Sequence, residues 1–266
     1  MQESENTNVE EQKHMHPSFL KVLEKRRVIQ QKLAGIKHII GIYSAKGGVG
    51  KTTTAVNIAY TLGTMGFKVG LLDADIDCPN VTMFLGIEDV KMEIKAFPIK
   101  PVEVHGIKVM STAIVVDELK RPIIWRGPLV TKMVEELLEN TEWGDLDYLI
   151  IDLPPGTSDV PLTIMQLLKG VFVIVTTPQR IASLNSIRSG LMAKRMNSAI
   201  LGVVENMSSG KASPGTISVL AELKTELLGT IKLSTSFNDH SDSGRIISMH
   251  DKEVATEYRK IAEQLG

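Results

Sequence analysis

Short apolar runs recur along the chain, and segments with helical periodicity separate them. The runs are rich in Val, Ile and Leu without polar alternation, as in parallel strands that are covered on both faces. They span residues 39–43, 68–73, 107–111, 148–152, 171–176 and 200–204. Helices are predicted over residues 51–64, 128–140, 160–168, 183–197, 216–227 and 253–264. This alternation predicts an α/β fold: a doubly wound, mostly parallel sheet with helices on both faces and ligands at the carboxyl ends of the strands.

The N-terminal part of the chain has a different pattern. Residues 1–16 contain few hydrophobic side chains and are predicted to form a disordered tail. Phe19, Val22 and Leu23, with the apolar positions of residues 28–33, are spaced as in an amphipathic helix over residues 17–34. We therefore expect a tail at 1–16, an N-terminal helical segment at 17–36 and one domain at 37–266.

Composition limits the possible classes of protein. The chain has 266 residues, of which 43% are hydrophobic and 23% charged, values typical of a soluble globular protein. A formal net charge of −1 gives no general attraction to DNA or to an anionic membrane. No apolar run reaches the roughly 18 residues of a membrane span, and the polar N-terminus resembles neither a secretory signal nor a transit peptide. The single cysteine, Cys78, excludes an internal disulfide and fits a reducing compartment, so a cytoplasmic location is predicted.

A glycine-rich segment carries the strongest chemical signal. Residues 44–54 read Ser-Ala-Lys-Gly-Gly-Val-Gly-Lys-Thr-Thr-Thr between a predicted strand and a predicted helix, the context that a phosphate-binding loop requires. Its glycines allow backbone N–H groups to converge on an anion at the start of the helix. Lys51 adds a charge for the β- and γ-phosphates, and Thr52 a hydroxyl for Mg²⁺. A glycine-rich turn without a ligand is the alternative. The predicted nucleotide contacts here are Ala45, Lys46, Gly47, Gly48, Val49, Gly50, Lys51, Thr52 and Thr53.

Two of the predicted strands end in carboxylates. Asp73, Asp75 and Asp77 alternate after one strand, and Asp152 follows the other. An apolar strand that ends in Asp is typical of the Walker-B arrangement, in which the acid holds Mg²⁺ directly or through water. An isolated strand-end aspartate could instead cap a helix, and Asp77 is expected to be a turn residue. With a phosphate loop upstream, Asp152 is the predicted Mg²⁺ residue.

The loop departs from its general pattern in a way that identifies a group. Ala45 replaces the usual first glycine and Lys46 precedes the glycine pair, which resembles the deviant-loop ATPases, the group of ParA, MinD and the nitrogenase iron protein. The resemblance implies that Lys46 crosses a dimer interface to the partner's nucleotide and stabilises the transferring phosphoryl group. It also implies that Asp75 positions the attacking water and that Asp73 supports the Mg²⁺ shell. A solvated loop lysine is the alternative for Lys46.

Further stretches narrow the group to one family. Five of them resemble, in the same order, the Mrp/ApbC-type ATPases, which are iron–sulfur cluster carriers: residues 124–128, 143–148, 152–159, 175–179 and 202–208. Residues 239–245 are similar to the family's segment over the nucleotide base. The resemblance covers roughly residues 37–250 and implies a homodimer that binds ATP and Mg²⁺ and works with iron–sulfur assembly or apo-target proteins. It implies an adenine contact for Asn206, for which a turn role is the alternative. Trp125 and Arg126 would lie at the switch or dimer face, or simply pack.

The match fails at the cluster ligands. Carriers of this type have a Cys-x-x-Cys pair shortly after the segment that corresponds to residues 205–208, whereas residues 207–215 here read Met-Ser-Ser-Gly-Lys-Ala-Ser-Pro-Gly. Cys78 is the only thiol, so a dimer would supply two thiolates where iron–sulfur clusters usually have four. We expect Cys78 to be a small, at least partly buried residue. ATP and Mg²⁺ are thus predicted ligands, and an iron–sulfur cluster is doubtful.

Two other classes remain as alternatives. A ParA- or MinD-like positioning ATPase could use Arg180, Arg188, Lys194 and Arg195 as a basic patch, but these residues equally fit a solvated helix face, so nucleic acid is not an expected partner. The C-terminal helix has a polar face of mixed charge, unlike a membrane-surface helix, and is expected to pack on the domain. A nucleotide-gated scaffold without a cluster is the other alternative, with the N-terminal helix as its docking element.

Overall fold

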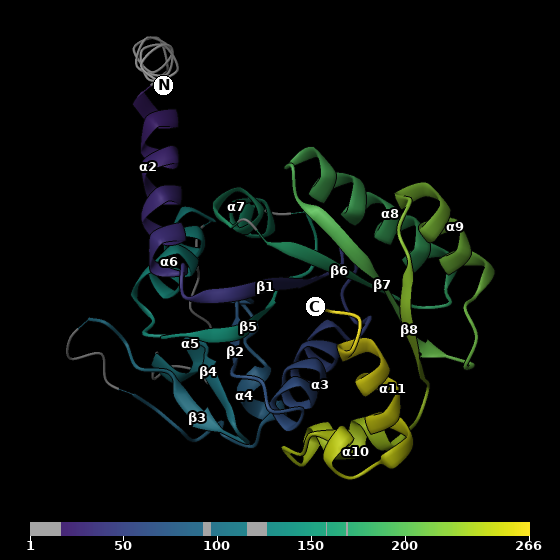
Figure 1. Ribbon diagram of the computed structural model, residues 1–266. Coiled ribbons are helices and arrows are strands. Elements are labelled where there is room, and N and C mark those ends of the chain that lie inside the picture. Colours follow the sequence, from purple (N-terminus) through teal and green to yellow (C-terminus); the bar gives the residue numbers. More distant parts are fainter. Residues whose placement is uncertain (1–16, 93–96, 116–126, 158, 169) are drawn as a thin grey trace.

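A computed structural model of the protein describes residues 17–92, 97–115, 127–157, 159–168 and 170–266. It contains an eight-stranded sheet in the order β3-β4-β2-β5-β1-β6-β7-β8 (Figure 1). Neighbouring strands are parallel except for β3, which runs antiparallel to β4. The strands are β1 (Ile36–Tyr43), β2 (Val69–Asp73), β3 (Val102–Val104), β4 (Ile107–Met110), β5 (Leu146–Asp152), β6 (Val171–Thr176), β7 (Ala199–Ser208) and β8 (Leu227–Lys232). The predicted α/β class and doubly wound sheet are confirmed.

Helices cover both faces of the sheet (Figure 1). One face carries α2 (Pro17–Lys32), α6 (Gly127–Asn140), α7 (Asp159–Leu167), α8 (Arg180–Arg195) and α9 (Pro214–Leu223). The other carries α3 (Lys51–Thr64), α4 (Val81–Phe84), α10 (Ser236–Asp242), the 3-10 turn η1 (Ile247–Met249) and α11 (Lys252–Ala262). The short α5 (Thr112–Val115) follows β4.

The central strands β1, β2, β5 and β6 are apolar over most of their length because side chains on both faces of the sheet are buried. Along β5, Ile150 belongs to the core under α3 and α11, whereas Leu149 and Ile151 belong to the core under the opposite helices. Alternate residues of a strand point to opposite faces, so a doubly covered strand has no position for a polar side chain until it ends. The polar residues that follow β1, β2 and β5 therefore gather at one end of the sheet.

The sequence prediction missed two strands and the short helices α4, α5 and α10, and it placed the end of one helix too late. All six predicted strands are present, but β3 and β8 were missed. The helix predicted to reach residue 227 ends at Leu223, because Lys224 adopts the left-handed conformation (φ 47°) that terminates α9. Leu227 instead begins β8.

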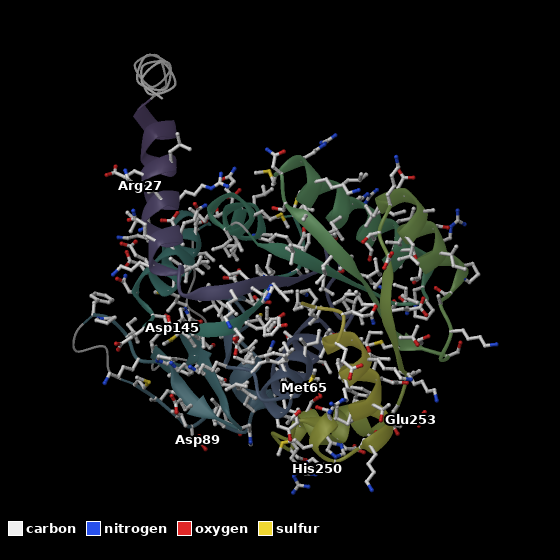
Figure 2. The ribbon with its side chains drawn as sticks, in the orientation of Figure 1. Arg27, Met65, Asp89, Asp145, His250 and Glu253 are labelled. Carbon is white, nitrogen blue, oxygen red and sulfur yellow. The ribbon has the colours of Figure 1, made fainter. Side chains whose placement is uncertain are left out.

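The C-terminal helix packs on the domain as predicted. It contacts α3 and β8, and Tyr258 and Ile261 are fully buried. Two polar side chains, one from the helix and one from the turn after it, bond the β8 backbone: Glu257 accepts from the Lys232 N–H at 3.3 Å, and Gln264 Nε2 donates to the Leu228 carbonyl at 2.7 Å. Glu253, at the beginning of α11, lies at the surface (Figure 2).

The N-terminal helix also packs against the domain through its C-terminal half. Ile29 and Leu33 are buried between α2 and the domain, and Lys25 pairs with Glu139 of α6 at 2.6 Å. Arg27 is exposed (Figure 2). The predicted tail at 1–16, and Trp125 with Arg126, lie outside the described residues. No helix in the described part of the chain is long and apolar enough to cross a bilayer.

Candidate functional site: a phosphate loop and two acidic strand ends

The glycine loop lies at the centre of the sheet. It joins β1, which is hydrogen-bonded between β5 and β6, to the first residue of α3, Lys51. Gly48 and Gly50 have φ of 73° and 86°, which favour glycine. A Cβ on Gly50 would also lie 2.1 Å from Asn206 Nδ2, whereas one on Gly48 would meet nothing within 4 Å. No side chain caps the start of α3, so its first backbone N–H groups are available to an anion.

Thr52 and Asp152 meet at the base of the loop. The Thr52 hydroxyl donates to Asp152 Oδ2 at 2.6 Å, and Asp152 is paired in register with Asp73 across β5 and β2. Asp152 is 1% exposed, and its second oxygen, Oδ1, is buried without a hydrogen-bond partner. A hydroxyl oxygen beside an unpartnered carboxylate oxygen is a donor set that suits Mg²⁺. In the described residues no group of three or more His, Cys, Asp or Glu could hold a metal, so phosphate or water oxygens would have to complete the coordination.

Burial makes the acid cluster costly to ionise. It raises the pKa of Asp152 to about 7, although the Thr52 hydrogen bond and the nearby Lys51 act in the opposite direction. Burial, and next the charge of Asp152, raise the pKa of Asp73 well above its usual range. Burial likewise raises the pKa of Asp75 and lowers that of Lys51. A divalent cation at this place would relieve the repulsion between the carboxylates.

The two strand-end acids differ in how much of their hydrogen-bonding capacity is free. Both oxygens of Asp73 accept hydrogen bonds: Oδ1 from the N–H of Asp75 at 3.1 Å, and Oδ2 from the N–H of Val81 at 3.2 Å and the Ser111 hydroxyl at 3.1 Å. Asp73 therefore fixes the turn that presents Asp75. The free oxygen of the pair belongs to Asp152. Ser111 was not identified from the sequence, because only folding brings β4 beside β2.

Cys78 is not buried as expected. It is exposed, in the turn after β2. Its N–H donates to Asp75 Oδ1 at 3.3 Å and its carbonyl accepts from Asn80, so backbone bonding holds this turn at the surface and leaves the thiol outside the core. Partial burial and the carboxylates of Asp75 and Asp77 raise the pKa of the thiol, which disfavours the thiolate that a metal would require.

The loop lysine, Lys46, is bonded within its own chain. Its Nζ donates to Gln179 Oε1 at 2.7 Å. The preceding N–H, that of Ala45, donates to Ser189 Oγ at 2.6 Å. Gln179 immediately precedes α8, and Ser189 belongs to α8, so the loop is bonded to this helix at two places. No pattern in the sequence assigns a role to either partner, although Gln179 lies within a stretch that carried the family resemblance.

Asn206 forms a hydrogen bond with the backbone of the loop. It is buried, and its Nδ2 donates to the Val49 carbonyl at 2.9 Å. An adenine contact for Asn206 stays a prediction. It would have to use the amide oxygen or the N–H group that is not donated to Val49. The segment that is similar to the family's base-covering segment forms α10 and the turn after it, and α10 contacts α4 and η1.

The segment that lacks the cysteine pair is closed by its own polar groups. Buried Glu205 accepts from the N–H and the hydroxyl of Ser213 at 2.9 and 2.6 Å. Ser208 Oγ donates to the Lys211 carbonyl at 3.0 Å and accepts from the Gly210 N–H at 3.1 Å. Hydroxyl and carboxylate groups thus shape this loop, and no thiol stands there.

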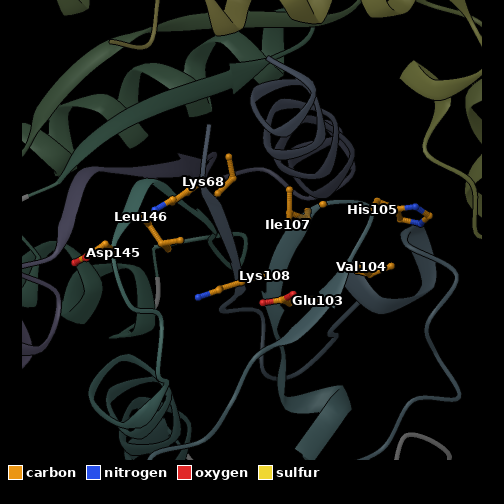
Figure 3. Close-up of a pocket in the computed structure, with 10 residues that line it drawn as sticks. Lys68, Glu103, Val104, His105, Ile107, Lys108, Asp145 and Leu146 are labelled. Atoms are coloured by element: carbon orange, nitrogen blue, oxygen red, sulfur yellow. The ribbon is translucent and has the colours of Figure 1, made fainter. Parts of the chain in front are cut away.

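A second hollow lies at the opposite end of the sheet (Figure 3). It is lined by β3 and by the amino ends of β2, β4 and β5, with residues that include Lys68, Glu103, Lys108 and Asp145. Lys108 Nζ donates to the Trp143 carbonyl at 2.7 Å. Ligands of open α/β sheets bind at the carboxyl ends of the strands, so the phosphate loop is the candidate nucleotide site.

The fold and the site define a class of protein. A glycine loop between the central strand and a helix that starts at a buried lysine, beside a strand that ends in Asp, is the arrangement of P-loop NTPases. The family model described as "ParA: NUBPL iron-transfer P-loop NTPase" matches residues 35–266, and the chain belongs to this family.

Individual relatives agree with the family. An iron–sulfur cluster carrier protein of Methanocaldococcus jannaschii is 39% identical over 269 residues, which cover 95% of this chain and 92% of the relative. A nucleotide-binding protein of Archaeoglobus fulgidus, solved in complex with ADP, has a TM-score of 0.71 at 32% identity and covers 88% of this chain and 95% of its own. The cell-division ATPase MinD of Pyrococcus furiosus has a TM-score of 0.68 at 23% identity, over 85% of this chain and 97% of its own, and thus shares the fold.

Proposed function

We propose that this protein binds Mg·ATP at the loop of residues 44–52 and hydrolyses it slowly as a homodimeric switch. The observation that carries the proposal is the Thr52–Asp152 pair with its unpartnered carboxylate oxygen beside a helix start that no side chain caps. The similar protein of Archaeoglobus fulgidus was solved with ADP, which supports a nucleotide as the ligand.

The residues divide the reaction among them. Backbone N–H groups of the loop and the ammonium of Lys51 bind the phosphates. Thr52 and Asp152 would hold Mg²⁺, which would neutralise charge that develops on the phosphate oxygens. Asp75 accepts a hydrogen bond from the water that attacks the γ-phosphorus in line. Burial raises the pKa of Asp75, which makes its carboxylate a stronger proton acceptor. Asp73 keeps the turn of Asp75 in place.

Lys46 completes the site of the other subunit. Leaving Gln179, it reaches the partner's nucleotide and stabilises the charge of the transferred phosphoryl group. Gly48 and Gly50, which follow Lys46 and have positive φ, give this segment the freedom to change conformation. The dimer would then assemble its complete site only when nucleotide lies between the subunits.

The chain serves iron–sulfur protein assembly without holding a cluster at the 207–215 loop. Its relatives are named iron–sulfur cluster carrier proteins, so assembly factors or apo-target proteins are the proposed partners. The loop itself contains serine, lysine and alanine in place of thiols, and these side chains do not ligate iron–sulfur clusters.

Matched lysine variants test the nucleotide switch. Lys51→Ala should abolish ATP binding in calorimetry with Mg²⁺, because the buried ammonium and the helix start act on the same phosphates. Lys46→Ala should bind ATP normally and lose turnover. Lys260→Ala, an exposed lysine of α11, is the control and should change neither. Unaltered turnover in Lys46→Ala would show that no lysine acts between subunits, and normal binding in Lys51→Ala would refute the site.

Metal and sulfide analysis tests the statement about the cluster. Protein purified and reconstituted without oxygen should contain no stoichiometric iron or sulfide and show no charge-transfer absorbance. A cluster that persists in Cys78→Ser would mean that ligands other than thiols of this chain hold it, and one that disappears in this variant would place it at the exposed turn.

A further inference from the structure

The outward face of α8 has the opposite character to that of an ordinary surface helix. Its fully buried residues are small, namely Ala182, Ser183, Ser186, Ser189, Gly190 and Ala193, whereas the larger Ile187 and Met192 are only half-buried against the core. Large aliphatic side chains lie on the outside instead, since Ile181, Leu184 and Leu191 are 56%, 48% and 41% exposed. A helix that packs on a core normally turns its large apolar residues inward. The inverted pattern indicates that a second surface covers this face.

The exposed residues form one continuous stripe. Positions 181, 184, 188, 191 and 195 follow the spacing i, i+3, i+7, i+10 and i+14, which places them on one side of a helix. Arg188 and Arg195 occupy the positions between and beyond the leucines, and both are exposed. We call these five residues, Ile181, Leu184, Arg188, Leu191 and Arg195, the α8 stripe.

Charge determines what can lie on the stripe. The segment of α8 contains Arg180, Arg188, Lys194 and Arg195 and no acidic residue. A second copy packed antiparallel about a twofold axis would place Arg188 against Arg188, because an isologous contact pairs each surface with itself. Like charges opposed in this way are unfavourable. An acidic partner would instead pair with the arginines at the rim, while its apolar residues cover the leucines.

We propose that the α8 stripe docks an acidic amphipathic helix of a partner protein. Apolar side chains of that helix, spaced at i, i+3, i+4 and i+7, would pack on Leu184 and Leu191. Glu or Asp beside them would bind Arg188 and Arg195, whose planar guanidinium groups can each donate two parallel hydrogen bonds to a carboxylate. Lipid and nucleic acid supply anionic groups but no matching apolar ridge of helical spacing, so the observations favour protein.

The stripe is connected to the phosphate loop by short contacts. Gln179, the residue before α8, accepts from Lys46 Nζ, and Ser189 in the middle of α8 accepts from the Ala45 N–H. A partner that shifts α8 would therefore move both backbone and side chain of the loop. Docking itself requires no nucleotide, so its failure would leave the proposed ATP site untouched.

The experiment measures the affinity of labelled peptides by fluorescence anisotropy. The probe is a helical peptide as long as α8, with Leu at heptad spacing and Glu at the flanking positions; its counterpart carries Lys in place of Glu. Wild-type protein should bind the acidic peptide and not the basic one. Leu184→Asp and Leu191→Asp should each weaken binding about tenfold or more, as for central apolar anchors. Leu129→Asp, at a 53% exposed leucine of α6, is the matched control and should bind like wild type.

A charge exchange provides the second measurement. The double variant Arg188→Glu with Arg195→Glu should lose the acidic peptide and gain the basic one, which a merely unfolded or loosened protein would not do. Equal affinity of wild type and Leu184→Asp would overturn the proposal, as would no binding of the acidic peptide. Tighter binding to phosphatidylglycerol vesicles or to duplex DNA would assign the stripe to those partners instead. Self-association that Leu184→Asp abolishes would make a second copy the occupant.

Discussion

Substitution of Gly50 by alanine tests whether the loop is shaped by its glycines and by Asn206 together. Alanine at a φ of 86° is strained by about 1–2 kcal/mol. Its Cβ would also lie 2.1 Å from Asn206 Nδ2, so the amide must move away from the Val49 carbonyl that it now bonds at 2.9 Å. A buried acceptor left without its partner costs about 1–3 kcal/mol. Gly50→Ala should therefore lower the free energy of unfolding by about 2–5 kcal/mol.

Gly48→Ala is the matched control for backbone strain. Its φ of 73° is also positive, but a Cβ there would touch nothing within 4 Å. Only the conformational term applies, so the loss should be about 1–2 kcal/mol. Both variants are measured by urea unfolding without nucleotide, from midpoints and a common slope.

A double variant separates the two contributions to Gly50→Ala. In Gly50→Ala with Asn206→Ala the amide that collides with the new methyl group is absent, so the double variant should be more stable than the sum of the single losses predicts, by about 1–2 kcal/mol. Equal losses for Gly48→Ala and Gly50→Ala, or additive losses in the double variant, would refute the reasoning.

Three further predictions follow from the site. Burial raises the pKa of Asp152 to about 7, so the folded state retains a proton that the unfolded state releases, and stability without Mg²⁺ should fall as the pH rises from about 4 to about 7. In urea unfolding, the stability of Asp152→Asn should depend less on pH than that of the wild type and should be higher at neutral pH by about 1–3 kcal/mol. Gln179→Ala should free Lys46 and raise ATP turnover about two- to tenfold in a phosphate-release assay, and slower turnover would contradict the restraint. Ser111→Ala should cost about 1 kcal/mol in urea unfolding by removing a donor to Asp73, and no loss would mean that this bond is unimportant.

The sequence was sufficient for the parts of the fold that are buried on both faces. In a chain of this composition, the uninterrupted apolar runs of β1, β5 and β6 indicate buried parallel strands, so these strands could be assigned without a structure. The strands that were missed are those at the two ends of the sheet. β3 has three residues, and β8 contains Gly229, where a Cβ would lie 2.7 Å from Ile261 Cγ1. This close approach depends on where α11 packs, which local sequence does not encode.

The candidate site was predictable where a residue type and its place at a strand end coincide. Thr52 and Asp152 are far apart in the chain, yet both follow from motifs, and they meet at 2.6 Å. Gln179, Ser189 and Ser111 follow from none, because each acts through one contact that only the tertiary fold creates. The burial expected for Cys78 was wrong for a similar reason: hydrogen bonds of the backbone fix its turn at the surface, and residue type alone says nothing of them.

The contacts between α11 and β8 have a consequence for the solubility of the folded chain. β8 is the last strand of its sheet, and such an edge presents unpaired backbone groups that can recruit a strand from another molecule and begin aggregation. Gln264 donates a hydrogen bond to the outward carbonyl of Leu228, and Glu257 accepts one from the outward N–H of Lys232. Removal of the C-terminal turns would expose these backbone groups of β8. The C-terminal helix and the turn after it therefore protect the edge strand from association with a strand of another molecule.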